Sequence, residues 1–145
     1  MMYLLDTNVV SELRKATKAR VGRPVIDRQV QAWASSVPNT DLYLSAITIL
    51  ELELGFLLLG RRDARQAAVL QSWVRDRVLV SFADRILGVD VAIAQRCAAL
   101  LVPDPVDQCD ALIAATALVH GMTVVTRNVS HFERTGVQIV NPWQD

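Results

Sequence analysis

The segment MYLLDTNVVSE at residues 2–12 decides the fold, because it joins a buried strand to a helix through a sharp polar turn. Tyr3, Leu4 and Leu5 form an apolar run that is too short for a helix and suits a buried strand. Apolar residues resume at helical spacing after the turn. Asp6 therefore lies at the carboxyl end of a strand, where open α/β sheets bind their ligands. A helix cap is the alternative role for this carboxylate.

Length and composition indicate one globular domain, residues 1–145, with 52% hydrophobic residues and a formal net charge of zero. A chain of this size can bury a core of its own. Its neutrality excludes a global field that would attract nucleic acid or a membrane. Basic residues nevertheless gather in segments 14–28 and 61–65, where solvated helix faces and loops explain them at least as well as phosphate contacts do.

The remaining strand-like segments are 42–44, 78–82, 123–126 and 137–140, and the helix-like segments between them are 24–34, 46–59, 63–77, 90–101 and 107–119. Strands that alternate with helices favour a parallel sheet with helices on both faces. The sequence therefore predicts an α/β fold.

Cysteine usage and hydropathy indicate the compartment. Cys97 and Cys109 have no metal-binding or CxxC spacing and resemble small buried hydrophobes in a reducing environment. The most strongly apolar run, 54–59, is too short to span a bilayer, and no charged segment followed by a long apolar stretch opens the chain. We expect a soluble, cytoplasmic protein without a membrane segment.

Glu51 and Glu53 share the helix expected over 46–59, but at a spacing of two residues they point to nearly opposite sides. Glu51 falls on the apolar stripe of Ile47, Leu54 and Leu58, which predicts that it faces inward. Solvent exposure of both glutamates is the alternative.

Asp107 and Asp110 begin a later helix, where capping and the helix dipole favour carboxylates. Asp110, however, heads the face of Ile113, Ala114 and Ala117, which must pack inward. An acid at the head of a buried stripe needs a cation or hydrogen bonds as partners. Asn128 follows the strand at 123–126, again at a carboxyl end, and offers a carbonyl oxygen.

Five segments together resemble PIN-domain ribonucleases, close to the VapC and FitB toxins of bacterial type II toxin–antitoxin pairs. The matching pieces are LLDTNVVSEL at 4–13, LSAITILELELG at 44–55, DALIAATA at 110–117, TVVTRNVSHF at 123–132 and VNPW at 140–143. The resemblance implies a three-layer α/β/α fold whose five-stranded parallel sheet has the order 3-2-1-4-5. It aligns Asp6, Glu51 and Asp110 with the metal-binding acids of the family. Asn128 aligns with a fourth catalytic position that is often Asp.

The resemblance also implies an activity: a metal-dependent endoribonuclease, the toxin of a pair, that cleaves RNA by activated water. Three neighbouring carboxylates repel one another unless a cation joins them. An all-oxygen ligand set suits Mg²⁺ or Mn²⁺, which activates water and offsets charge on phosphoryl oxygens. The expected partners are RNA, a small cognate antitoxin and a second copy of the chain. For the homodimer, we expect an apolar face of Ile49, Leu52, Phe56 and Leu59.

Two alternatives remain open. A catalytically weak PIN-like module that binds RNA or a partner is compatible with the neutral Asn128. A phosphoaspartyl enzyme or receiver domain could also use Asp6, but it needs a lysine at the end of a later strand. The two lysines, Lys15 and Lys18, lie in the segment after the first helix. His131 could act as a general base, although a structural role is the more common one for such a histidine.

Overall fold

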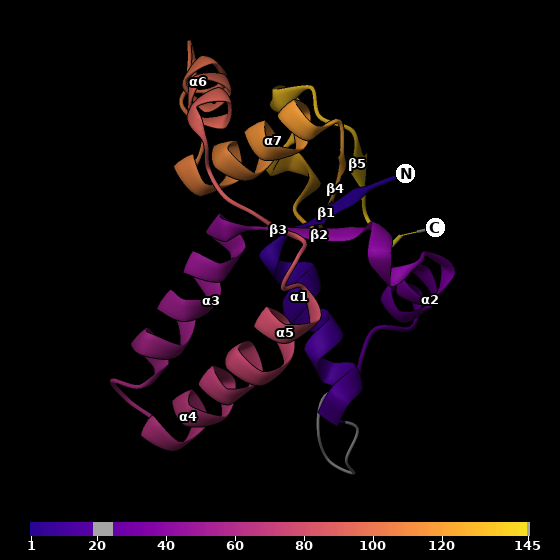
Figure 1. The fold of residues 1–145 in the computed structure, drawn as a ribbon, viewed down its shortest axis with the longest axis vertical. Coiled ribbons are helices and arrows are strands. Elements are labelled where there is room, and N and C mark those ends of the chain that lie inside the picture. Colours follow the sequence, from indigo (N-terminus) through magenta and orange to yellow (C-terminus); the bar gives the residue numbers. More distant parts are fainter. Residues whose placement is uncertain (19–24, 145) are drawn as a thin grey trace.

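The computed structural model describes residues 1–18 and 25–144, and its strands form one parallel sheet of order β3-β2-β1-β4-β5 (Figure 1). The central strand β1 (Tyr3–Leu5) lies between β2 (Leu42–Ser45) and β4 (Thr123–Val125). The outer strands are β3 (Ile86–Leu87) and β5 (Ile139–Val140). The predicted strand order is confirmed.

Helices cover both faces of this sheet (Figure 1). One side carries α1 (Thr7–Arg14), α2 (Arg28–Ser36), α3 (Ala46–Leu59), α4 (Ala64–Trp73) and the short α5 (Leu79–Ser81). The other side carries α6 (Val91–Leu100) and α7 (Gln108–His120). Short helical turns are η1 (Lys15–Lys18), η2 (Asn39–Asp41), η3 (Val74–Val78), η4 (Val129–His131) and η5 (Glu133–Thr135). None of the helices in the described residues is long and apolar enough to cross a membrane.

The two faces of β1 belong to two separate core clusters, because successive strand residues point to opposite sides of the sheet. Leu5 packs into a cluster with Val9 and Val10 of α1. Leu4 packs into the cluster built on Ile113 and other residues of α7. Both leucines are fully buried. The strand that ends at Asp6 is therefore fixed from both sides.

The third strand was predicted at 78–82, and that prediction is wrong. This segment continues α4 as a π-helical turn, η3, followed by α5. Val74 and Val78, four residues apart, are both buried, whereas Val80 is 67% exposed. Helical spacing of the buried positions explains the difference. The third strand is instead β3, whose Ile86 pairs with Leu44 of β2.

The second helix begins later than predicted. α2 starts at Arg28, where the side chain of Asp27 accepts hydrogen bonds from the N–H groups of Gln29 and Val30. The buried carboxylate of Glu12 in turn accepts the Asp27 N–H at 2.9 Å. A side-chain cap therefore sets this boundary. The expected break at residues 22–24 lies outside the described residues.

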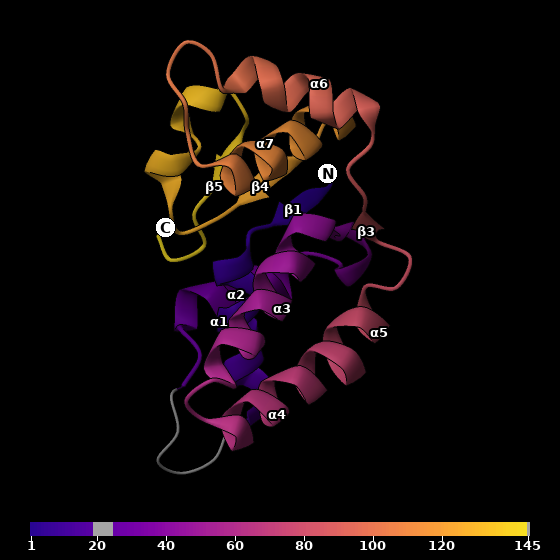
Figure 2. The same ribbon diagram turned by 90° about the vertical axis from the view of Figure 1, so that its left-hand side faces the viewer.

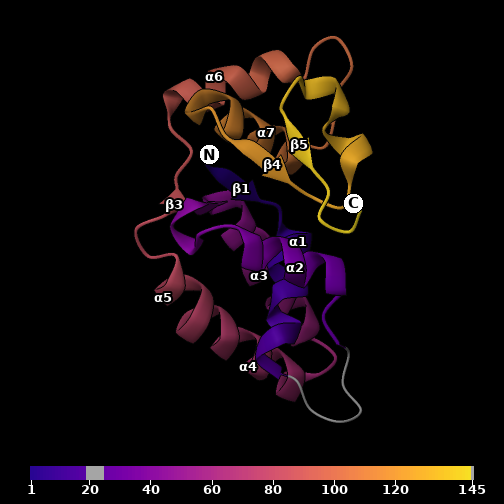
Figure 3. The same ribbon diagram turned by 90° about the vertical axis from the view of Figure 1, so that its right-hand side faces the viewer.

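α3 and α4 pack against each other and extend away from the sheet (Figures 2 and 3). The side of α3 that we expected to be available for a second copy is largely internal, since Leu52 and Phe56 are buried in the core. Two leucines that we expected to face inward, Leu54 and Leu58, are 49% and 54% exposed. The exposed leucines of α3 are Leu50, Leu54, Leu57 and Leu58. A helix that is apolar all round does not reveal which face packs inward.

Candidate functional site

Asp6 ends β1 and begins α1, and both of its carboxylate oxygens are engaged. Oδ1 accepts the N–H of Thr7 at 2.8 Å, which is the predicted helix cap. Oδ2 accepts the Thr126 hydroxyl at 2.7 Å and the Asn8 side-chain amide at 3.2 Å. Only 5% of Asp6 is exposed. Capping and a place in the site are therefore compatible, because one oxygen holds the helix while the other faces β4.

Thr126, immediately after β4, links the ends of the two central strands. Its fully buried hydroxyl lies between Asp6 and Asn8 and also accepts the N–H of Asn128 at 3.0 Å. The side-chain Oδ1 of Asn8 accepts a hydrogen bond from the backbone N–H of Arg127 at 3.2 Å. We did not predict a role for Thr126. A hydroxyl directly after two apolar strand residues, at a carboxyl end, was the signal that could have found it.

Glu51 reaches the site from the second turn of α3. The hydroxyl of Thr7 donates to its Oε1 at 2.7 Å. Glu53 points elsewhere and pairs with Arg75 at 2.9 Å. The predicted difference between the two glutamates is confirmed, although the apolar stripe from which we inferred it is wrong at Leu54.

Asp110 lies in the first turn of α7, and its N–H donates to the capping carboxylate of Asp107 at 3.0 Å. Its own Oδ2 lies 3.1 Å from Nδ1 of His131, which follows β4 in η4. Asp110 and His131 also border a cavity of about 350 Å³ that Ser130 and Arg134 help to line. The structure thus brings His131 to the predicted acid and leaves Asp107 as the cap.

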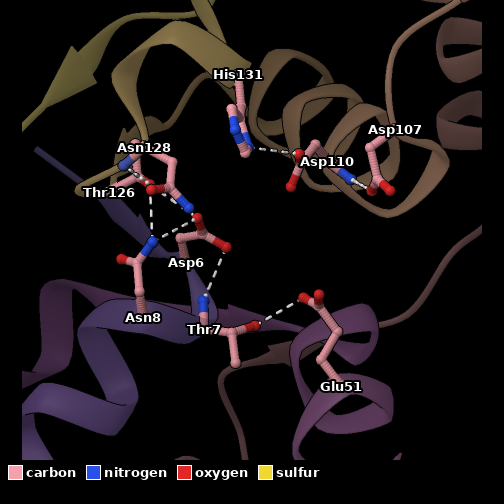
Figure 4. Close-up of polar contacts among 9 residues, drawn as sticks. All are labelled: Asp6, Thr7, Asn8, Glu51, Asp107, Asp110, Thr126, Asn128 and His131. Carbon is pink, nitrogen blue, oxygen red and sulfur yellow. Dashed lines mark hydrogen bonds and ion pairs between the residues drawn. The ribbon is translucent and has the colours of Figure 1, made fainter.

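Electrostatics link these carboxylates (Figure 4). Burial raises the pKa of Glu51, the Thr7 hydrogen bond opposes that shift, and the charges of Asp6 and Asp110 raise the pKa further. Burial also raises the pKa of Asp110, followed by the charges of Asp6 and Asp107, and His131 opposes the shift. The charge of Asp6 therefore disfavours ionisation of both Glu51 and Asp110. Asp6, Glu51 and Asp110 face one shared space from three elements.

The predicted metal ligands lie around this space without closing on one point. Within residues 1–18 and 25–144, no group of three or more His, Cys, Asp or Glu side chains is gathered tightly enough to hold one ion. Asp6, Glu51 and Asp110 are held instead by hydrogen bonds to neighbouring side chains. The donor chemistry still fits a hard divalent cation, because all three acids offer carboxylate oxygens, and burial and nearby negative charges raise the pKa values of Glu51 and Asp110.

Asn128 takes part through its backbone. Its N–H donates to Thr126, whereas its side chain is exposed and joins none of the hydrogen bonds that hold the three acids in the described structure (Figure 4). The structure brings Asp6, Glu51 and Asp110 to one shared space, and the catalytic and metal roles of these acids and of position 128 stay predictions.

Comparison with known proteins points to one family. A family model described as PIN domain matches residues 3–137. VapC ribonuclease Y4jK from Sinorhizobium fredii is 37% identical over 148 aligned positions, covering 99% of each chain. Toxin FitB from Neisseria gonorrhoeae is 38% identical over 149 positions, covering 99% of this chain and all of the relative. The crystal structure of FitAcB from Neisseria gonorrhoeae superposes with a TM-score of 0.84 and 37% identity, covering 99% of this chain and 100% of that one.

Proposed function

The chain belongs to the PIN-domain family, and on this premise we propose that it is an endoribonuclease that acts as the toxin of a toxin–antitoxin pair. The relatives named VapC ribonuclease and Toxin FitB, which match nearly the whole chain, support this proposal. We further propose that residues 1–145 act as a single catalytic domain.

The observation that carries the proposal is the shared space of Asp6, Glu51 and Asp110. The pKa values of Glu51 and Asp110 are raised by burial and by neighbouring negative charges. Such a cluster is expected where a cation binds or where proton transfer occurs. We propose that these acids hold Mg²⁺ or Mn²⁺, which when bound supplies charge that offsets the negative charge developing on the phosphoryl oxygens.

The residues of this chain supply the positioning. Thr126 and Asn8 fix the orientation of Asp6, and Thr7 fixes Glu51. The hydrogen bond to His131 orients the Asp110 carboxylate. Side chains held in this way need little reorganisation when the substrate phosphate arrives, which is the main contribution of a protein to phosphoryl transfer.

Cleavage of a labelled RNA by purified protein tests the proposal. We expect cleavage with Mg²⁺ or Mn²⁺, none in EDTA, and a loss of about 1,000-fold or more in Asp6→Asn and Asp110→Asn, the range seen when a key electrostatic group is removed. Full activity of either variant, with contaminating nuclease excluded, would overturn the mechanism. RNA binding without turnover by the wild type would favour the non-catalytic module.

We also propose inhibition by a small antitoxin protein, because a solved toxin–antitoxin complex from Klebsiella pneumoniae is similar to this chain, with 26% identity and a TM-score of 0.66. Expression of this chain alone should slow growth, and co-expression of the protein encoded beside it should restore growth. Normal growth with abundant, active protein would remove the toxin role and leave the nuclease activity intact.

Self-association remains part of the proposed function, with a revised surface. The exposed residues Leu50, Leu54, Leu57 and Leu58 give α3 an apolar face that a second copy could cover. Light scattering at tens of micromolar should report a dimer. Leu54→Lys combined with Leu58→Lys should give a folded monomer, whereas a monomeric wild type would contradict the proposal.

A further inference from the structure

Arg127 and Trp143 form a stacked pair beside the acid site. The guanidinium carbon of Arg127 lies 5.2 Å from the centroid of the Trp143 ring. Trp143 is partly buried against the core cluster, and its backbone N–H donates to the Asn141 side chain at 3.0 Å. The ring is therefore held by packing, and its backbone is fixed by a hydrogen bond. It can fix the plane of an exposed guanidinium.

The backbone of Arg127 is tied to the catalytic acids. Its N–H donates to Asn8, whose amide also bonds Asp6. The next residue, Asn128, donates its N–H to Thr126, which bonds the same carboxylate. The backbone of Arg127 therefore occupies a fixed position at the rim of the site, two hydrogen bonds from Asp6.

The charge of Arg127 is not neutralised within the described part of the chain. None of the ion pairs or side-chain hydrogen bonds found there includes its guanidinium. Other ring-stacked arginines differ: Arg75 also pairs with Glu53, and Arg85 donates to three backbone carbonyl groups. The guanidinium groups of Arg75 and Arg85 therefore hold parts of the fold together. Arg127 is exposed, and its guanidinium lies over the Trp143 ring.

An anionic substrate needs such a group here, because the four carboxylates of Asp6, Glu51, Asp107 and Asp110 make the pocket negative. A planar guanidinium donates two parallel hydrogen bonds to one phosphate, which an ammonium group cannot do. We propose that Arg127, oriented by Trp143, binds a backbone phosphate of the RNA beside the phosphodiester that is cleaved. This inference rests on the proposed ribonuclease function. Arg127 is the binding residue and Trp143 a positioning residue.

Binding to a fluorescently labelled single-stranded oligoribonucleotide in EDTA, followed by anisotropy at several salt concentrations, tests the proposal apart from catalysis. Arg127→Ala should weaken binding about tenfold, the effect of one charged hydrogen-bonded contact. The slope of log affinity against log salt should also become shallower by about 0.7, the counterion release of one phosphate on a single strand. Arg127→Lys should keep the slope and recover only part of the affinity.

Arg96→Ala is the matched control, because Arg96 is an exposed arginine on α6 and the variant loses the same charge. Trp143→Leu should weaken binding as Arg127→Ala does, and Trp143→Phe, which keeps an aromatic face, should restore most of it. In cleavage assays with Mg²⁺, Arg127→Ala should raise KM and change kcat by less than about twofold, because the contact is present before and during the reaction. Melting curves identify any variant that is not folded.

Equal RNA affinity of Arg127→Ala and Arg96→Ala, or an unchanged salt slope, would overturn the proposal, as would a wild type that does not bind RNA. A wild type that binds RNA with the expected Arg127 dependence but does not cleave it would contradict the ribonuclease function and leave this contact standing. If the wild type cleaves RNA and Arg127→Ala has an unchanged KM, the ribonuclease function stands and the proposed Arg127 contact is wrong.

Discussion

The two halves of the site are held in different ways. Asp6, at the strand end, is 5% exposed and accepts hydrogen bonds from Thr7, Asn8 and Thr126. Glu51 and Asp110, on α3 and α7, each have one side-chain partner, and both have a raised pKa. Asp6, the strand half of the site, is oriented by hydrogen bonds before any ligand arrives. Glu51 and Asp110, the helix half, carry negative charge that a bound cation can neutralise.

This difference follows from the elements that carry the acids. The ends of two adjacent parallel strands are fixed by the sheet, and Asp6 N–H itself donates to the carbonyl of Val125 at 2.9 Å. Helices α3 and α7 approach the sheet edge from outside and contribute one carboxylate each. Like charges at short range disfavour joint ionisation, so binding of a cation is favoured on the helix side. Mutations should therefore affect geometry in one half and charge in the other.

Among changes that leave all three acids in place, the largest expected effect comes from Thr126→Val in the strand half. This change leaves Asp6 without its closest donor and the Asn128 N–H without an acceptor. A buried group left unpaired costs about 1–3 kcal/mol of folding free energy. A carboxylate misplaced by about 1 Å costs about 100-fold in rate. Chemical denaturation and initial cleavage rates measure the two effects.

Thr126→Ser is the matched control, because it retains the hydroxyl and should recover most of the activity. Thr7→Val removes the corresponding donor from Glu51 in the helix half. Glu51 is only partly buried, so we expect a smaller loss of stability from this change. Equal losses from the two valine variants would show that the halves do not differ as described.

A second prediction concerns charge repulsion in the helix half, Glu51 and Asp110. Glu51→Gln removes one of the mutually repelling charges, so the protein in EDTA should be more stable by about 1 kcal/mol. In a domain of about 150 residues or more, this gain raises the melting temperature by about 2–4 °C. The same variant should show a smaller rise of the melting temperature with millimolar Mg²⁺ than the wild type, because ligand linkage depends on affinity. Differential scanning fluorimetry across a Mg²⁺ titration measures both.

Glu53→Gln on the same helix is the control. It breaks an exposed pair with Arg75, which is worth about 0–1 kcal/mol, so the melting temperature should fall slightly or stay unchanged. If Glu51→Gln lowered the melting temperature as well, or if the wild type gained nothing from Mg²⁺, repulsion among the acids would not be the dominant feature of the helix half.

Sequence patterns predicted a parallel α/β sheet and singled out the acids for a physical reason, whereas the strand order came from the resemblance to PIN-domain proteins. Asp6 and Asp110 interrupt apolar stretches, and a charged residue in such a place requires a partner. The five-residue apolar run at 78–82 misled us, because a short run of this kind fits a strand or a buried helical turn equally well. The inward face of α3 was ambiguous in the same way, because leucines surround that helix.

Hydrogen bonds between residues that are far apart in the chain could not be predicted from the sequence. Thr126 and Asp6 are separated by 120 positions, and nothing local to either residue specifies their contact. The pairing of His131 with Asp110 likewise depends on how η4 folds back over the start of α7. The resemblance to PIN-domain proteins placed the acids in the same site, but the contacts of Asp6 with Thr126 and of Asp110 with His131 emerged only from the structure.

The smallest expected effect concerns position 128, at the border between the two halves. The Asn128 side chain is exposed and takes no part in the hydrogen bonds that hold the three acids, so Asn128→Asp would add charge to the rim and keep the hydrogen bonds of the strand half. A carboxylate at the rim attracts a divalent cation through water, and salt screens part of that attraction. We expect the wild type to hold one ion tightly near Asp6 and Asp110, and the variant to bind Mn²⁺ a few-fold more tightly without RNA, on the order of 0.5–1 kcal/mol. Cleavage should not improve, because a more negative pocket also repels the phosphate.

Calorimetric titration of Mn²⁺ decides the matter, with Gln95→Glu on the exposed face of α6 as the charge-matched control. Two tight sites in the wild type, or equal Mn²⁺ affinity in all three proteins, would contradict this account of Asn128.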